Sequence, residues 1–273
     1  MDHPFRLTYC LIFGWCLCAT TPPVGAQQHT VSSFNTQQLS DVYFSEGASA
    51  GDINGDGKAD VVCGPYWYSG PDFKVKHEIY PPVAQDRERY ADNFFSWVYD
   101  FDSDGYGDVF VVGFPGTPAY VYQNPGADSP ESDNQAHWTK HQVIDWVSNE
   151  SPHFTNLVGD AQPELVCTRD GFFGFATLND EDPFGEWTFH AISEQTAPSR
   201  FGHGLGVGDV NGDGLGDLIF SGGWFEQPSE GALTNRWRLH PAKLSNSYGG
   251  AEMLSLIHIS EPTRLGMLSR MPS

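Results

Sequence analysis

The sequence predicts an all-β fold, a β-propeller assembled from four-stranded blades. Three observations support this prediction: an acidic nine-residue loop recurs along the chain, a short apolar run follows each copy, and no long helical periodicity appears. Several short strands per unit, repeated at a regular spacing, are typical of propeller blades. A β-sandwich and a right-handed β-solenoid are the alternatives, and solenoid repeats are usually much shorter.

The recurring loop sets the period of the repeat. Three complete copies, with side-chain oxygens at positions 1, 3, 5 and 9 and glycine at position 6, span 52–60 (the first loop), 100–108 (the second loop) and 209–217 (the fourth loop). Their starts are 48 and 109 residues apart, so the second gap holds two units. A degenerate copy at 156–164 (the third loop) fills it, with Val158 at position 3 and Ala161 at position 6. The chain therefore contains four units.

Other features keep the same phase as the loops. Apolar runs follow the loops at 61–63, 109–112, 165–167 and 218–220. Aromatic runs closed by proline come next in three units, at 66–71, 120–125 and 224–228. Later in three units lies a Trp-x-x-His pair, with a weaker version near His77; the pairs are Trp138/His141, Trp187/His190 and Trp237/His240. Because the pair recurs at one phase, we expect packing and a structural hydrogen bond from it, not catalysis.

The oxygen spacing of the loops is that of a site for a hard cation. Alternate residues point inward, glycine permits the sharp turn, and position 7 offers its backbone carbonyl. This predicts one structural Ca²⁺ in each complete loop and none in the third; Mg²⁺ rarely uses so complete a protein cage. The expected ligands are Asp52, Asn54, Asp56, Lys58 (carbonyl) and Asp60; Asp100, Asp102, Asp104, Tyr106 (carbonyl) and Asp108; and Asp209, Asn211, Asp213, Leu215 (carbonyl) and Asp217. The alternative, that these loops are simple hairpin turns, explains their glycines but not the side-chain oxygens at positions 1, 3, 5 and 9.

Over roughly residues 29–250, these motifs resemble the FG-GAP/VCBS repeat family, the calcium-loop propellers also seen in integrin heads. The segments 44–48, 64–71 and 203–209 resemble a secreted bacterial subgroup that is similar to the propeller part of fungal aldos-2-ulose dehydratase. The family resemblance implies that the four units are part of a longer, seven-bladed propeller. The narrower resemblance implies acid–base chemistry on a sugar.

A second set of residues lies six positions before each loop: Glu46, Phe94, Glu150 and His203, with Asp92, Asn93 and His153 nearby. If the strand entering each loop is the innermost of its blade, these positions ring the central channel. Such a ring suits a second divalent metal or a polar ligand such as a sugar. The dehydratase resemblance makes Glu46, Glu150 and His203 candidate catalytic residues, with Glu150 or His203 as the proton carrier. Alternatively, these side chains only contact channel water.

The two ends of the chain carry separate signals. Residues 1–26 are predicted to be a signal peptide, with Arg6 before a short apolar stretch and small residues at the cleavage site. The stretch is too short for a membrane span, so none is expected after its removal. Residues 27–253 form the predicted partial propeller. Residues 254–273 resemble translated sequencing adapter, which predicts a non-native tail and a truncated propeller; a genuine amphipathic tail is the alternative.

The charge of the chain restricts its partners. The 273 residues carry a formal net charge of −21, and 10 of the 35 acidic residues lie in the three complete loops. An acidic surface argues against nucleic acid and anionic membranes as partners. Secretion, to the exterior, the periplasm or the cell surface, fits the abundance of calcium outside cells.

Three functions stay open from the sequence alone. The first is a secreted calcium-binding propeller that acts as a binding module for a carbohydrate or an extracellular protein. The second is a sugar dehydratase or lyase with a metal-assisted site in the axial channel. The third is a structural surface or adhesion component. The fold alone does not decide among them, and the sequence favours a protein that is not an enzyme.

Overall fold

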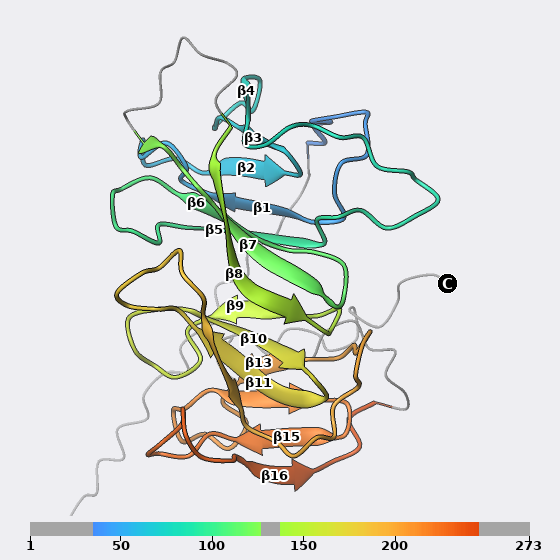
Figure 1. Cartoon of the computed structure of the whole chain (residues 1–273), viewed down its shortest axis with the longest axis vertical. Coiled ribbons are helices and arrows are strands. Elements are labelled where there is room, and N and C mark those ends of the chain that lie inside the picture. The colour runs from blue at the N-terminus through green and yellow to red at the C-terminus, as the bar shows by residue number, and fades with distance from the viewer. Residues whose placement is uncertain (1–34, 127–136, 246–273) are drawn as a thin grey trace, which may run out of the picture. The chain divides into compact units, whose positions relative to one another are not determined.

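The computed structural model describes residues 35–126 and 137–245; the predicted signal peptide and the predicted tail lie outside these ranges. Within the described residues all regular structure is β. Sixteen strands form four four-stranded antiparallel sheets, and these ranges contain no α-helix (Figure 1). The predicted all-β fold of four-stranded blades is therefore confirmed.

Each sheet consists of four strands that are consecutive in the chain and paired in chain order. The first sheet contains β1 (Ala48–Gly51), β2 (Asp60–Cys63), β3 (Tyr66–Tyr68) and β4 (Lys76–Glu78). The second contains β5 (Phe95–Tyr99), β6 (Asp108–Val112), β7 (Thr117–Gln123) and β8 (Thr139–Val147). The third contains β9 (His153–Thr155), β10 (Glu164–Arg169), β11 (Phe172–Thr177) and β12 (Thr188–Ala191). The fourth contains β13 (Gly206–Gly208), β14 (Asp217–Phe220), β15 (Gly223–Glu226) and β16 (Arg238–Pro241).

The four nine-residue loops occupy the same connection in every sheet, between its first and second strands. Position 9 of each loop is the first residue of the second strand; these residues are Asp60, Asp108, Glu164 and Asp217. The degenerate third loop follows this rule as strictly as the complete ones. The assignment of four units from loop spacing alone is therefore confirmed.

Hydrophobic clusters join each sheet to the next one along the chain. In β6 the neighbouring residues Val109 and Phe110 enter different clusters, because successive side chains of a strand point to opposite faces. Val109 packs with Val62 of the first sheet, whereas Phe110 packs with Leu165 and Trp187 of the third. A further cluster joins the third and fourth sheets and includes Val166, Phe175, Leu218, Phe225 and Trp237. Both faces of the second and third sheets are thus buried between neighbours.

The Trp residues of the Trp-x-x-His pairs tie the sheets together along their last strands. The backbone N–H of each Trp donates a hydrogen bond to a carbonyl of the preceding sheet. The three bonds are Trp138 to Ile79 (2.9 Å), Trp187 to Val143 (2.8 Å) and Trp237 to Ile192 (2.9 Å). In each case the acceptor lies two residues after the His of the preceding unit, so the pair is a repeating connection between blades.

The His residues of the pairs act within their own sheets. Each one bonds to a side chain at the end of the third strand; the pairs are His77 with Ser69 (3.0 Å), His141 with Gln123 (3.2 Å), His190 with Thr177 (3.0 Å) and His240 with Glu226. His77 occupies the same register as the others, opposite Trp67. The expectation of a structural hydrogen bond is confirmed, and it extends to the first sheet, where Lys74 replaces the Trp.

We expect Thr177→Val to destabilise the protein by about 1 kcal/mol, because the two side chains have the same shape and only the hydrogen bond is lost. Nδ1 of His190 donates to the carbonyl of Leu233 (2.9 Å), so Nε2 accepts from the Thr177 hydroxyl and loses its donor in the variant. The melting temperature should fall by roughly 2–4 °C. Thr188→Val, at an exposed position opposite Thr177, is the matched control, and an equal fall in both variants would contradict the assignment.

Candidate functional site

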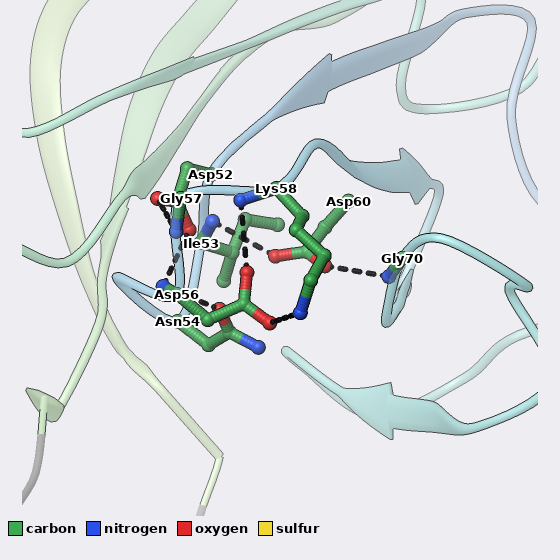
Figure 2. Close-up of polar contacts among 8 residues, drawn as sticks. All are labelled: Asp52, Ile53, Asn54, Asp56, Gly57, Lys58, Asp60 and Gly70. Atoms are coloured by element: carbon green, nitrogen blue, oxygen red, sulfur yellow. Dashed lines mark hydrogen bonds and ion pairs between the residues drawn. The ribbon is translucent and has the colours of Figure 1, made fainter.

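The first loop is folded by its own acidic side chains (Figure 2). Asp52 accepts hydrogen bonds from the backbone N–H groups of Asp56 (3.1 Å) and Gly57 (2.8 Å). Asp56 in turn accepts from the N–H of Lys58 (2.9 Å), and the Lys58 ammonium lies 3.0 Å from its other oxygen. The hydrogen bond from the Lys58 side chain, followed by the one from its backbone N–H, lowers the pKa of the Asp56 carboxyl. Gly57 has φ of +78°, a conformation that favours glycine and explains its place at position 6.

The second and fourth loops repeat this geometry. The first Asp of each loop accepts from the N–H groups at positions 5 and 6: Asp100 from Asp104 (3.1 Å) and Gly105 (2.9 Å), and Asp209 from Asp213 (3.2 Å) and Gly214 (2.8 Å). The Asp at position 5 accepts from the N–H at position 7, which is Tyr106 in one loop and Leu215 in the other. Three separate stretches of the chain thus adopt one loop conformation.

The carboxylate at position 9 has a different environment, because it is buried. Asp108 is 1% exposed and accepts from the N–H groups of Phe101 (3.0 Å) and Asn124 (2.7 Å). Asp217 accepts in the same way from Val210 (2.8 Å) and Gln227 (2.9 Å). Burial raises the pKa of Asp108 to about 7 and also raises the pKa of Asp217. Position 9 therefore joins the second and fourth loops to the residues that follow the third strand of their sheets.

The second loop brings three predicted ligands close together. One carboxylate oxygen from each of Asp100, Asp102 and Asp108 lies within 4.8 Å of the other two. These are hard oxygen donors of the kind that Ca²⁺ prefers, and their mutual repulsion favours a bound cation. The residues present therefore fit a calcium ion. In the first and fourth loops position 3 is a neutral amide, Asn54 or Asn211, so those loops carry one carboxylate fewer.

The third loop keeps its fold by other means. Glu164 at position 9 accepts from the N–H groups of Leu157 (2.7 Å) and Val158 (3.3 Å), and burial raises its pKa. Asn156 accepts from the N–H of Gly159 (2.7 Å). Position 3 is Val158, which offers no side-chain oxygen, so a metal-free third loop stays a prediction.

The residues predicted to ring a channel are brought together only in part. The His203 imidazole forms an ion pair with the Glu150 carboxylate. Glu46 instead accepts from the Tyr43 hydroxyl and from the N–H of Ala91 (3.4 Å). The backbone ties these segments in pairs, since Glu46 N–H donates to Asn93 and Glu150 N–H donates to Gly202, both at 2.9 Å.

Glu46 borders an open cavity of about 1260 Å³ that the sequence did not indicate. Its walls come from the segments 38–46 and 87–92, together with Phe114 and Thr117. Tyr90 is 64% exposed there, and its ring packs against Phe114. Single aromatic residues in connections of different lengths carry no periodic signal, so only the three-dimensional structure reveals this site.

Parts of this chain are similar to known proteins. Residues 44–73 match the family model described as FG-GAP repeat. Human integrin alpha-IIb is 28% identical over 163 residues, which cover 48% of this chain and 15% of that protein, so the chain spans only a small part of this relative. A solved structure of an Agrocybe aegerita lectin, described as recognising non-reducing terminal N-acetylglucosamine, aligns with a TM-score of 0.41 and 18% identity, covering 64% of this chain and 47% of the lectin.

Across the described ranges, no helix has the length and apolar character needed to cross a bilayer.

The segment 44–73, which matches the family model, contains the first loop and strands β1, β2 and β3. Its loop has the same hydrogen bonds as the second and fourth loops. The first unit of this four-sheet protein is therefore the part of the chain that matches the FG-GAP repeat model.

Proposed function

We propose that this chain is an extracellular, calcium-binding module that holds a carbohydrate or an extracellular protein as its ligand. The cluster of Asp100, Asp102 and Asp108 is the observation that carries the proposal. The similarity to an integrin alpha chain supports an extracellular setting, and the signal peptide predicted for residues 1–26 supports secretion. A net charge of −21 makes nucleic acid an unsuitable partner.

The ions would have a structural role in this module. Each complete loop would hold Ca²⁺ through the side chains at positions 1, 3, 5 and 9 and the carbonyl at position 7. Bound calcium supplies positive charge that offsets the repulsion among the carboxylates. Each loop connects the first and second strands of its sheet, so an ordered loop would fix the register in which these two strands pair.

Calcium titration by isothermal calorimetry tests the proposal, with an expected stoichiometry of three ions per chain. Asp104→Ala should lower this number to two, because it removes the side-chain oxygens at position 5 of the second loop. Asp160→Ala, at position 5 of the third loop, is the matched control and should leave three. A stoichiometry of zero, or a loss of one ion with Asp160→Ala, would contradict the proposal.

One observation favours a second function, acid–base chemistry on a sugar in the channel. The Glu150 carboxylate holds the His203 imidazole, an arrangement that can keep a proton carrier oriented, and the pair could also contribute to a second divalent metal site. Turnover of unsaturated or keto sugars that disappears in His203→Gln would favour this function. Binding without turnover in the unmodified protein would favour the binding module.

A further inference from the structure

We infer that the rim formed by the β4–β5, β6–β7 and β12–β13 connections binds a neutral polysaccharide strand, which packs against Tyr90, Phe114 and Phe201. These three side chains are called the aromatic strip below. The inference rests on the proposed binding function and names its ligand class and its site. The strip lies at the end of the strands away from the nine-residue loops, since neighbouring strands are antiparallel.

The aromatic strip is exposed although its members are among the most apolar side chains. Tyr90 is 64% exposed and Phe201 is 44% exposed, while Phe114 between them is half-buried. Ring centres lie 5.6 Å apart from Tyr90 to Phe114 and 5.5 Å apart from Phe114 to Phe201. The ring planes are inclined by 38° in the first pair and by 70° in the second, so the three side chains pack against one another and form one continuous, bent aromatic surface. A contiguous exposed aromatic surface marks a binding site more often than a single exposed side chain does.

Phe201 is held in its exposed position at a conformational cost. Its φ is +60°, which an L-residue with a large side chain rarely adopts, and its N–H donates to the carbonyl of Ser148 (2.9 Å). Next to it, the Nε of Arg200 donates to the carbonyl of Pro115 (2.6 Å). Strain of this kind persists only where the surroundings enforce it, and it concentrates at functional sites.

The Arg200 guanidinium joins two members of the strip. It lies 5.1 Å from the ring centre of Phe114 and 4.7 Å from that of Phe201. Gly116 makes room for it, because a Cβ at that position would lie 2.9 Å from Arg200 Nε. The connection that carries Phe201 is therefore fastened to the turn that carries Phe114. The strip is preorganised, which lowers the entropic cost of binding.

The charge beside the strip selects a neutral polymer. The cavity at Tyr90 and Phe114 is lined by four carboxylates and two guanidinium groups, from Asp41, Glu46, Arg87, Glu88, Arg89 and Asp92. The excess of carboxylates repels an acidic polysaccharide, and carboxylates and arginines both pair well with sugar hydroxyls. Aromatic faces next to such groups suit an amphipathic sugar ring better than the apolar side chains of a protein interface core.

The test uses the full chain with calcium present and measures calorimetric affinity for neutral hexasaccharides of glucose, N-acetylglucosamine, xylose and mannose, with hexagalacturonate as the acidic probe. We expect at least one neutral probe to bind and the acidic probe not to bind. Phe201→Gly should weaken binding at least tenfold while the melting temperature stays equal or rises, because glycine relieves the φ of +60°. A purely structural Phe201 would lower the melting temperature instead.

Phe73→Gly is the matched control. Phe73 also has positive φ (+53°) but lies outside the strip, so its replacement should leave the affinity unchanged. If Phe201→Gly fails to fold, Tyr90→Ala provides the same readout at a more exposed position. Absence of binding to every neutral probe, binding to the acidic probe alone, or unchanged affinity in the strip variants would overturn the inference. If the strip variants lose binding to an extracellular protein while the unmodified protein binds no sugar, the inference is also overturned. Calcium titration of the same sample shows separately whether the proposed calcium-binding function holds.

Discussion

Removal of calcium with EGTA should lower the melting temperature of the protein by roughly 10 °C. An ion that binds only the folded state stabilises it by about 1.4 kcal/mol when its concentration is about ten times its Kd, which holds at ~1 mM calcium for a Kd of ~0.1 mM. Three such loops contribute about 4 kcal/mol, and a chain of this size loses roughly 2–4 °C per kcal/mol. Differential scanning calorimetry in calcium and in EGTA measures the difference.

The loop variants show whether this shift comes from the predicted sites. Asp104→Ala should remove about a third of the shift in melting temperature, because Asp104 is a predicted ligand of one of the three ions, the one in the second loop. Asp160→Ala, at the same position of the third loop, should leave the shift intact. Magnesium in place of calcium should restore little of it, since Mg²⁺ requires a stricter octahedral geometry. An unchanged melting temperature in EGTA, in a sample free of calcium by elemental analysis, would refute calcium stabilisation.

The sequence predicts the parts of this fold that are coded locally. A loop such as 100–108 is specified by oxygens and glycines within nine residues, so its spacing was sufficient to locate all four β-sheets. His77 was a weaker signal because Lys74 stands where the other units have Trp, yet it occupies the shared register. In the other three sheets the backbone N–H of that Trp donates to a carbonyl of the preceding sheet.

The rim was less predictable, because it is coded by distant segments. The position six residues before each loop singles out both Glu150 and His203, which contact each other. The hydrogen bonds of Glu46 go instead to Tyr43 and Ala91, which have no shared position in the repeat. The aromatic strip comes from three connections of unequal length and unrelated sequence. Arg200 reaches from the connection that carries Phe201 to the one that carries Phe114, and Tyr90 packs on Phe114 from a third connection. No local rule contains such a contact.

Asp108→Ala should destabilise the protein by about 3–5 kcal/mol even when calcium is absent, since it leaves two buried N–H groups without acceptors. Asp108 is 1% exposed and accepts from Phe101 and Asn124, which are themselves buried. The side-chain amide of Asn124 also donates to the carbonyls of Ile53 (2.9 Å) and Gly107 (3.0 Å). Loss of Asp108 therefore loosens the contact between the first and second loops as well as the second loop itself.

Urea denaturation in EGTA separates this hydrogen-bonding role from metal binding. Asp102→Ala is the matched control, because Asp102 is an exposed member of the same acidic cluster and, among residues 35–126 and 137–245, bonds only to the side chain of Gln123. It should reduce calcium affinity while changing the free energy of unfolding in EGTA very little. Asp108→Asn retains one acceptor oxygen and should give an intermediate loss. Equal effects of the Asp102 and Asp108 variants in EGTA would mean that position 9 has no function beyond its charge, whereas a difference confined to Asp108 would make it the residue that connects the loop to its sheet whether or not calcium is bound.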